Sequence, residues 1–272
     1  MSWAPPRLDG AVAIVTGSSR GVGKGIALAL GDCGATVYVT GRSTVDEAAA
    51  EVSARGGRDM AARTDHTDHA QTAALFERVQ REEDRLDLVV ANAWGGYEGH
   101  DHRAFGDPFW EQPDSRWETM VDAGLRASYE TARLAARALL PQGGGLIVFT
   151  AGWDEPGEYL GNLLYDVVKS ATSRLVFGAA RELRPHGVAV VGVYPGFTRT
   201  EAVVDAFAAG GAEPPETTHS PELVGRAVAH LLADPEVLEL SGTGAQAAAF
   251  AARYGFTDVD GRTLEPFRLT ES

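Results

Sequence analysis

The feature that most constrains this chain is a regular alternation between two kinds of segment. Short runs rich in β-branched residues recur, each followed by a longer stretch rich in Ala, Leu and Arg with helical spacing. The runs lie at residues 12–16, 36–40, 86–91, 146–150 and 188–193. Strands that alternate with helices form right-handed crossovers, which give a parallel sheet covered on both faces. The pattern therefore predicts an α/β fold built on a doubly wound parallel sheet.

The remaining elements complete this plan. Helices are predicted at residues 22–31, 44–55, 69–84, 115–139, 163–183 and 221–233. A weaker strand around Met60 and another at 237–240, which could close the sheet, bring the total to about seven. With 272 residues, 44% of them hydrophobic, and no low-complexity linker, we expect one domain over residues 1–272.

Two segments interrupt the alternation. Residues 94–114 are rich in Gly, Pro, His and aromatic residues, and residues 201–220 end in a stretch rich in Pro and Thr. Both follow strand ends, where open parallel sheets bind their ligands. We expect both to be loops that line a substrate pocket; the alternative is that they are surface insertions.

Composition excludes several classes of partner. A formal net charge of −14 argues against nucleic acid or anionic lipid, because phosphate binding needs clustered cations. The one cysteine, Cys33, cannot form an internal disulfide, the first residues lack the plan of a signal peptide, and no apolar run could cross a bilayer. His100 and His102 flank Asp101, but no third ligand suggests a metal site. We expect a cytoplasmic protein that binds small molecules and no metal, nucleic acid or membrane.

A glycine-rich turn follows the first strand. In Thr-Gly-Ser-Ser-Arg-Gly-Val-Gly-Lys, Gly17, Gly21 and Gly23 permit a tight turn and a close approach to a pyrophosphate, with helix N–H groups aimed at its oxygens. Ser19 and Val22 lie in the same turn and are expected to contact the ligand with them. A purely structural turn is the alternative.

This Thr-Gly-x-x-x-Gly-x-Gly spacing resembles that of the short-chain dehydrogenase/reductase family, which implies a Rossmann fold over most of the chain. Further stretches match in order. By resemblance, Asp65 meets the adenine, Asn92 at the end of the fourth strand contacts the cofactor, and the turn after the sixth strand holds the nicotinamide amide. That turn contains Pro195, Gly196, Phe197, Thr198 and Thr200.

The cofactor preference depends on two arginines. After the second strand, Thr-Gly-Arg-Ser offers no carboxylate for the adenosine ribose of NAD. Arg42 and Arg20 could instead both face a 2′-phosphate, which an arginine fork binds by charge-assisted hydrogen bonds. We therefore predict NADPH/NADP rather than NADH, with solvated surface arginines as the alternative.

Tyr165 and Lys169 are the candidate catalytic pair. Four residues apart on a helix, they share one face, and an ammonium beside the phenol lowers the phenol pKa. Tyr165 can then give a proton to a carbonyl oxygen or take it back. Among 22 arginines the chain has only two lysines, Lys24 and Lys169, both within these motifs. By resemblance, Lys169 also holds the nicotinamide ribose, and both residues contact the cofactor.

The chain differs from the family at two helper positions, whose side chains usually assist the catalytic tyrosine and lysine. Gly152 stands where the catalytic serine usually lies, and Gly124 where the catalytic asparagine lies. Thr150, two residues from Gly152 on the same strand face, could substitute. Other candidates are Trp153, Asp154, Tyr97 and His100. Otherwise, the substrate is an activated ketone or imine, or the protein has left redox chemistry.

The substrate pocket is expected to include Trp94, Tyr97, Gly152 and Trp153. Aromatic residues of segment 94–114 could stack on an aromatic or polyketide-like substrate, or bury the segment against the sheet. Stretches around residues 93–98, 108–113, 124–126 and 182–188 look most like the branch related to dehydrogenase/reductase member 1.

These observations favour an NADPH-dependent reductase of a carbonyl or imine in a medium-sized substrate. The alternatives are a non-redox isomerase or cyclase that retains NADPH and an inactive nucleotide-sensing protein. By resemblance, helices 115–139 and 163–183 pair between subunits, which implies a homodimer or homotetramer.

Overall fold

A single seven-stranded parallel sheet forms the centre of the protein. The computed structural model describes residues 3–96, 98–99, 105–152 and 159–268. The strand order is β3-β2-β1-β4-β5-β6-β7, and every pairing is parallel. The strands are β1 (Val12–Val15), β2 (Thr36–Gly41), β3 (Arg58–Arg63), β4 (Leu88–Ala91), β5 (Gly145–Thr150), β6 (Val188–Tyr194) and β7 (Gly244–Gln246). The doubly wound parallel sheet predicted from the sequence is confirmed.

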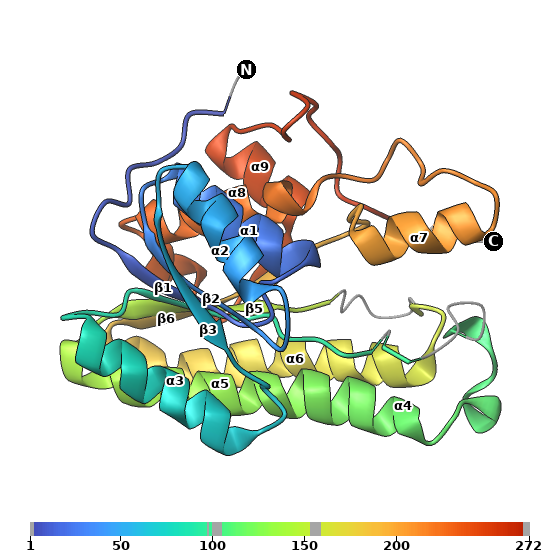
Figure 1. Cartoon of the computed structure of the whole chain (residues 1–272), viewed down its shortest axis with the longest axis horizontal. Coiled ribbons are helices and arrows are strands. Elements are labelled where there is room, and N and C mark those ends of the chain that lie inside the picture. Colours follow the sequence, from blue (N-terminus) through green and yellow to red (C-terminus); the bar gives the residue numbers. More distant parts are fainter. Residues whose placement is uncertain (1–2, 97, 100–104, 153–158, 269–272) are drawn as a thin grey trace.

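Helices cover both faces of this sheet (Figure 1). One face carries α1 (Gly21–Asp32), α2 (Val45–Ala54), α8 (Pro221–Ala233) and α9 (Ala247–Tyr254). The other carries α3 (His69–Glu82), α5 (Ala127–Leu139) and α6 (Leu163–Leu183). Alternate strand residues serve the two layers: Val15 packs under α1, whereas Ile14 points to the opposite layer. Because both faces are covered, the central strands are apolar throughout.

The helix predicted at 115–139 forms one uninterrupted helical stretch, but its middle part is π-helical rather than α-helical. It comprises α4 (Ser115–Trp117), the π-helical segment η3 (Glu118–Arg126) and α5, with helical backbone angles at both junctions. Short 3-10 turns lie nearby: η2 (Phe109–Glu111) precedes this stretch, and η4 (Leu140–Gln142) follows it. A third, η5 (Arg184–His186), follows α6. A π-helical stretch often marks a functional site. Here it contains Gly124.

The strand predicted at residues 237–240 is wrong. Residues 237–240 form the 3-10 turn η6 (Val237–Leu240), and the closing strand is β7. The Tyr194 side chain lies against the start of this strand, where a Cβ on Gly244 would lie 2.3 Å from the Tyr194 hydroxyl oxygen.

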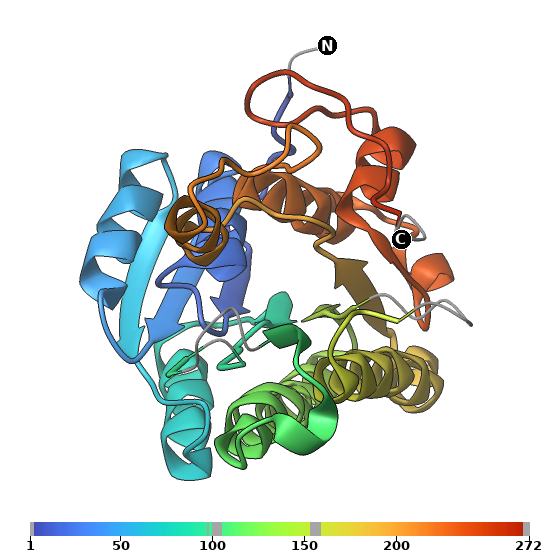
Figure 2. The same cartoon turned by 90° about the vertical axis from the view of Figure 1, so that its right-hand side faces the viewer.

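Segment 201–220 is not simply a loop, because it begins with α7 (Glu201–Ala209). The Thr200 hydroxyl caps this helix by accepting a hydrogen bond from the Val203 amide at 3.3 Å. In Figure 2, turned so that the side carrying α7 faces the viewer, the segments that follow the strands gather at this edge. No helix within the described ranges is long and apolar enough to cross a membrane.

Candidate active site

Glycines shape the turn between β1 and α1. Gly17 and Gly21 have φ of +64° and +57°, values that side chains rarely adopt. A Cβ on Gly23 would lie 2.3 Å from the Gly17 carbonyl oxygen, so α1 can start this close to β1 only with glycine there. Ser19 abuts Gly41 at the end of β2, and the Val22 side chain packs against the apolar core.

The N-terminus of α1 already binds an anionic group of the protein. The Gly21 amide donates a hydrogen bond to the Glu201 carboxylate at 3.0 Å, whereas the side chain of the N-cap residue, Arg20, makes no capping hydrogen bond. An exposed helix N-terminus with outward N–H groups attracts anions. The glycine turn and this amide therefore fit the pyrophosphate of a dinucleotide.

Asn92 holds the glycine turn in place. Its Nδ2 donates to the carbonyl oxygens of Thr16, at 2.9 Å, and Gly17, at 3.2 Å. The Thr16 hydroxyl in turn accepts from the amides of Asn92, at 2.8 Å, and Ala93, at 3.0 Å. Thr16 thus joins the ends of β1 and β4, a positioning role that sequence analysis did not assign.

Arg20 and Arg42 both contact a carboxylate that was not predicted, that of Glu98. Arg20 Nη2 lies 2.6 Å from Glu98 Oε1, and Arg42 Nη2 pairs with Glu98 Oε2. This contact raises the pKa of Arg42. Glu98 comes from the segment after β4, and no sequence signal singles it out.

The remaining predicted cofactor residues lie at two further strand ends. The Asp65 carboxylate closes a turn after β3, accepting from the Thr67 amide at 2.9 Å and hydroxyl at 2.7 Å. Burial raises the pKa of Asp65, but these hydrogen bonds and the charge of Arg42 together bring it below its usual value. The residues predicted to hold the nicotinamide amide lie in the turn directly after β6: Pro195, Gly196, Phe197, Thr198 and Thr200.

The turn after β6 is tied to residues near α8. The His219 amide donates to the Phe197 carbonyl at 3.1 Å, and the Thr198 hydroxyl donates to the Pro195 carbonyl at 3.3 Å. The Phe197 ring contacts Phe207 of α7, with centroids 6.1 Å apart. This turn is therefore held between α7 and the strand end.

Tyr165 and Lys169 lie on one face of α6 and share an aromatic neighbour. Lys169 Nζ is 5.5 Å from the centroid of the Tyr165 ring and 4.4 Å from that of Trp94. The Trp94 and Tyr165 rings meet edge to face, with centroids 5.6 Å apart. Burial lowers the pKa of Lys169 to about 8, while the ring faces favour its ammonium form.

The first turn of α6 fixes Tyr165. Asn162 Oδ1 accepts from the Tyr165 amide at 2.9 Å, and Asn162 Nδ2 donates to the Phe105 carbonyl at 2.8 Å. The Phe105 ring lies edge to face with Tyr165 at 5.5 Å. The buried Asn162 therefore anchors the backbone of Tyr165 and links Phe105 to the start of α6.

The two glycines at the helper positions make room for other side chains. A Cβ on Gly124 would lie 2.6 Å from Trp94 Cζ3, and one on Gly152 would lie 2.4 Å from Lys169 Cβ. The Trp94 ring thus fills the space beside Gly124, and the aliphatic part of the Lys169 side chain fills the space beside Gly152. The Thr150 hydroxyl lies 3.5 Å from the Ala91 carbonyl of β4, and its substitution for the serine stays a prediction.

Several predicted residues fall outside the described residues. These are Tyr97, His100, Asp101, His102, Trp153 and Asp154. Within the part of the chain that the structure describes, no group of three or more His, Cys, Asp or Glu side chains could hold a metal ion.

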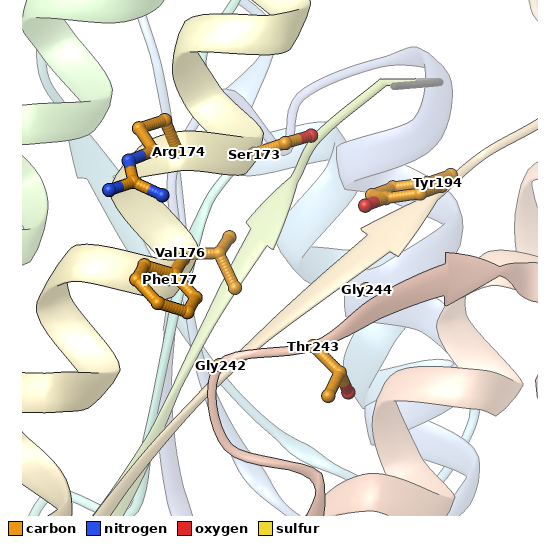
Figure 3. A pocket seen from close by; sticks show the side chains of 8 residues that line it. All are labelled: Ser173, Arg174, Val176, Phe177, Tyr194, Gly242, Thr243 and Gly244. Carbon is orange, nitrogen blue, oxygen red and sulfur yellow. The ribbon is translucent and has the colours of Figure 1, made fainter. Parts of the chain in front are cut away.

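A hollow of about 240 Å³ lies between α6 and the ends of β6 and β7 (Figure 3). It is lined by Ser173, Arg174, Val176, Phe177, Tyr194, Gly242, Thr243 and Gly244. None of these residues belongs to the glycine turn or to the Tyr165–Lys169 pair. The hollow does adjoin the candidate active site, because the hydroxyl of its lining residue Ser173 donates a hydrogen bond to the Gly152 carbonyl at 3.3 Å.

Comparison with known proteins decides the family. The short chain dehydrogenase model matches residues 11–209. The chain belongs to the short-chain dehydrogenase/reductase family. It is 38% identical over 277 residues to dehydrogenase/reductase SDR family member 1 of Mus musculus, covering 96% of this chain and 87% of that relative. The resemblance to the member 1-like branch is thereby confirmed.

Solved structures of this oxidoreductase family share the fold. A metagenomic short-chain oxidoreductase in complex with NADP is 28% identical, with a TM-score of 0.69 over 85% of this chain and 93% of its own. A 7 alpha-hydroxysteroid dehydrogenase complexed with NADH and 7-oxo glycochenodeoxycholic acid is 24% identical, with a TM-score of 0.73 over 88% and 93%. The second supports the fold alone.

Proposed function

We propose that this protein is an NADP-dependent reductase of a carbonyl or imine group, with Tyr165 as the proton donor. The observation that carries the proposal is the placement of Tyr165 and Lys169 on one face of α6, with Lys169 Nζ 5.5 Å from the phenol ring. The bound nicotinamide would supply the hydride. Tyr165 would protonate the oxygen or nitrogen that receives the charge.

Lys169 has two tasks in this proposal. Its ammonium stabilises phenolate at Tyr165, and it binds the nicotinamide ribose hydroxyls. With its pKa lowered to about 8, Lys169 is still mostly charged at neutral pH. The glycine turn, with the Gly21 amide, would hold the pyrophosphate; Asp65 and the turn at 195–200 would contact the adenine and nicotinamide ends.

The preference for NADP is supported by Arg20 and Arg42, whose guanidinium groups converge on one carboxylate. A site that gathers two guanidinium groups on one anion also suits a 2′-phosphate. Arg42→Asp is expected to shift the preference toward NADH. An unchanged ratio of NADPH to NADH affinity would contradict this assignment.

The substrate is proposed to be medium-sized and aromatic or polyketide-like, because Trp94 and Phe105 both face the Tyr165 ring. We also propose a homodimer or homotetramer. An apolar hollow of about 350 Å³ between η3, α5 and α6 supports pairing through these helices. Light scattering during gel filtration tests the assembly.

The catalytic test is a panel of activated ketones and imines with NADPH, followed at the nicotinamide absorbance. We expect NADPH oxidation with at least one substrate and a loss of about a hundredfold or more in Tyr165→Phe. NADPH binding with no oxidation across the panel, or full activity in Tyr165→Phe, would contradict the proposal.

A non-redox isomerase or cyclase is the second candidate. It is favoured by the Trp94 ring and the Lys169 stem, which fill the space beside positions 124 and 152, where the family's asparagine and serine would stand. Conversion of substrate without a change in nicotinamide absorbance would support it. Tight NADPH binding with no conversion of any kind would indicate a nucleotide sensor.

A further inference from the structure

Glu98 is held between two arginines at the adenosine end of the site. Glu98 lies in a turn of the segment after β4, where its amide donates a hydrogen bond to the Gly95 carbonyl at 2.9 Å. Each carboxylate oxygen of Glu98 then takes one guanidinium, from Arg20 or Arg42. The Glu98 side chain is 30% exposed, against 67% for Arg20 and 55% for Arg42. The carboxylate is therefore the most enclosed of the three charges.

A second carboxylate lies at the pyrophosphate end. Glu201, in the first turn of α7, accepts the hydrogen bond from the Gly21 amide at the start of α1. The two positions that suit the anions of a phosphorylated dinucleotide thus each contact a carboxylate of the protein. The two carboxylates are far apart in sequence, Glu98 after β4 and Glu201 in α7.

We propose that Glu98 is a selectivity determinant for the cofactor, because it competes with the 2′-phosphate for Arg20 and Arg42. The inference rests on the proposed function, in which these arginines bind that phosphate. A phosphate with up to two negative charges and three acceptor oxygens can displace a carboxylate from paired guanidinium groups. An unphosphorylated ribose carries no charge with which to do so.

The competition lowers NADPH affinity without abolishing it. Glu98 is tethered within its turn, so it acts at a high effective concentration, and each NADPH molecule must break both ion pairs. Partly exposed ion pairs contribute modestly, so removing the competitor is expected to strengthen NADPH binding by about three- to tenfold. Glu201 faces a group that both nucleotides share and therefore does not discriminate between them.

The experiment is calorimetric titration of the full chain with NADPH, NADH and adenosine 2′,5′-bisphosphate. Glu98→Gln and Glu98→Ala are compared with Glu111→Gln, which removes the same charge from an exposed position of the same segment. We expect both Glu98 variants to bind NADPH and the bisphosphate about three- to tenfold more tightly, with NADH changed less than twofold. Glu111→Gln should change neither, and Glu201→Gln should strengthen NADPH and NADH alike.

Unchanged or weaker NADPH binding in folded Glu98 variants would overturn the inference, as would an equal gain for NADH. Circular dichroism and thermal unfolding verify the fold of each variant. If the native chain bound no nicotinamide nucleotide, the proposed function would fail as well. If it bound NADPH but the Glu98 variants bound no more tightly, only this inference would fail.

Discussion

The Lys169 ammonium lies 4.4 Å from the centroid of the Trp94 ring, and the edge of that ring fills the space beside Gly124. In related dehydrogenases the catalytic asparagine is expected at position 124. Here the neighbour of the lysine is the face of an aromatic ring, which attracts a cation through its quadrupole. The reactive end therefore keeps the lysine and tyrosine in a different polar environment.

Trp94 and Gly124 are expected to depend on each other for stability. Gly124→Asn alone places a Cβ 2.6 Å from the indole and should cost about 1–3 kcal/mol. Trp94→Gly alone leaves a cavity and should cost about 3–5 kcal/mol. The double variant removes the clash, so its cost should be smaller than the sum by at least about 1 kcal/mol. Urea denaturation of all four proteins measures this; additive costs would contradict the contact.

Restoring the family's serine at position 152 should harm the protein. The Cβ of Gly152→Ser would lie 2.4 Å from Lys169 Cβ, so the helix or the lysine must shift, at a cost of about 1–3 kcal/mol. Gly178→Ser is the control, because a Cβ at that position of α6 meets no atom within 4 Å. Thermal unfolding compares the two, and equal stability would refute the predicted crowding.

Lys169 should titrate near pH 8, because burial disfavours its ammonium. The measurement is direct, since the chain has only two lysines. Carbon-13 lysine labelling gives two side-chain signals, and Lys24→Arg identifies that of Lys169. A midpoint close to the ordinary lysine value of 10.5 would show that burial does not control this group.

The same shift sets the sign of a pH effect on stability. Between pH of about 8 and 10.5 the unfolded chain binds more protons at this lysine than the folded chain does. The Lys169 contribution to the free energy of unfolding therefore rises with pH across that window. Below pH 8, burial of the ammonium destabilises the fold. Urea denaturation should show this rise in the native chain relative to Lys169→Met; identical slopes would argue against it.

Nucleotide binding should fail when the glycine turn is filled. A Cβ in Gly23→Ala would lie 2.3 Å from the Gly17 carbonyl oxygen, forcing α1 away from β1 and moving the Gly21 amide. We expect NADPH affinity to fall by at least about tenfold, since positioned helix amides recognise the pyrophosphate. Gly178→Ala serves as the control and should bind normally in the same titration. Unaltered binding by folded Gly23→Ala would place the pyrophosphate elsewhere.

Most strands and helices were predictable because their signals are local. The apolar runs at β1 and β6 reflect strands covered on both faces, and α6 begins and ends where its spacing predicted. The strand predicted at 237–240 was wrong because apolar character alone does not distinguish a strand from a 3-10 turn. Helix α7 was missed because it is only nine residues long, too short for its apolar spacing to stand out beside the Pro-rich end of segment 201–220.

Pairs of residues that are close along the chain could be predicted without a structure. Tyr165 and Lys169 share a face because helix geometry brings residues four apart together, and the glycine turn is set by its own three glycines. Only the tertiary structure decided that Glu98 meets Arg20 and Arg42, and that Trp94 lies over Lys169. Those contacts depend on the strand order, in which β4 lies beside β1 and next to β5. Neighbouring parallel strands end at the same edge of the sheet, so the segments that follow them meet there. The spacing of residues along the chain does not indicate which strands are neighbours.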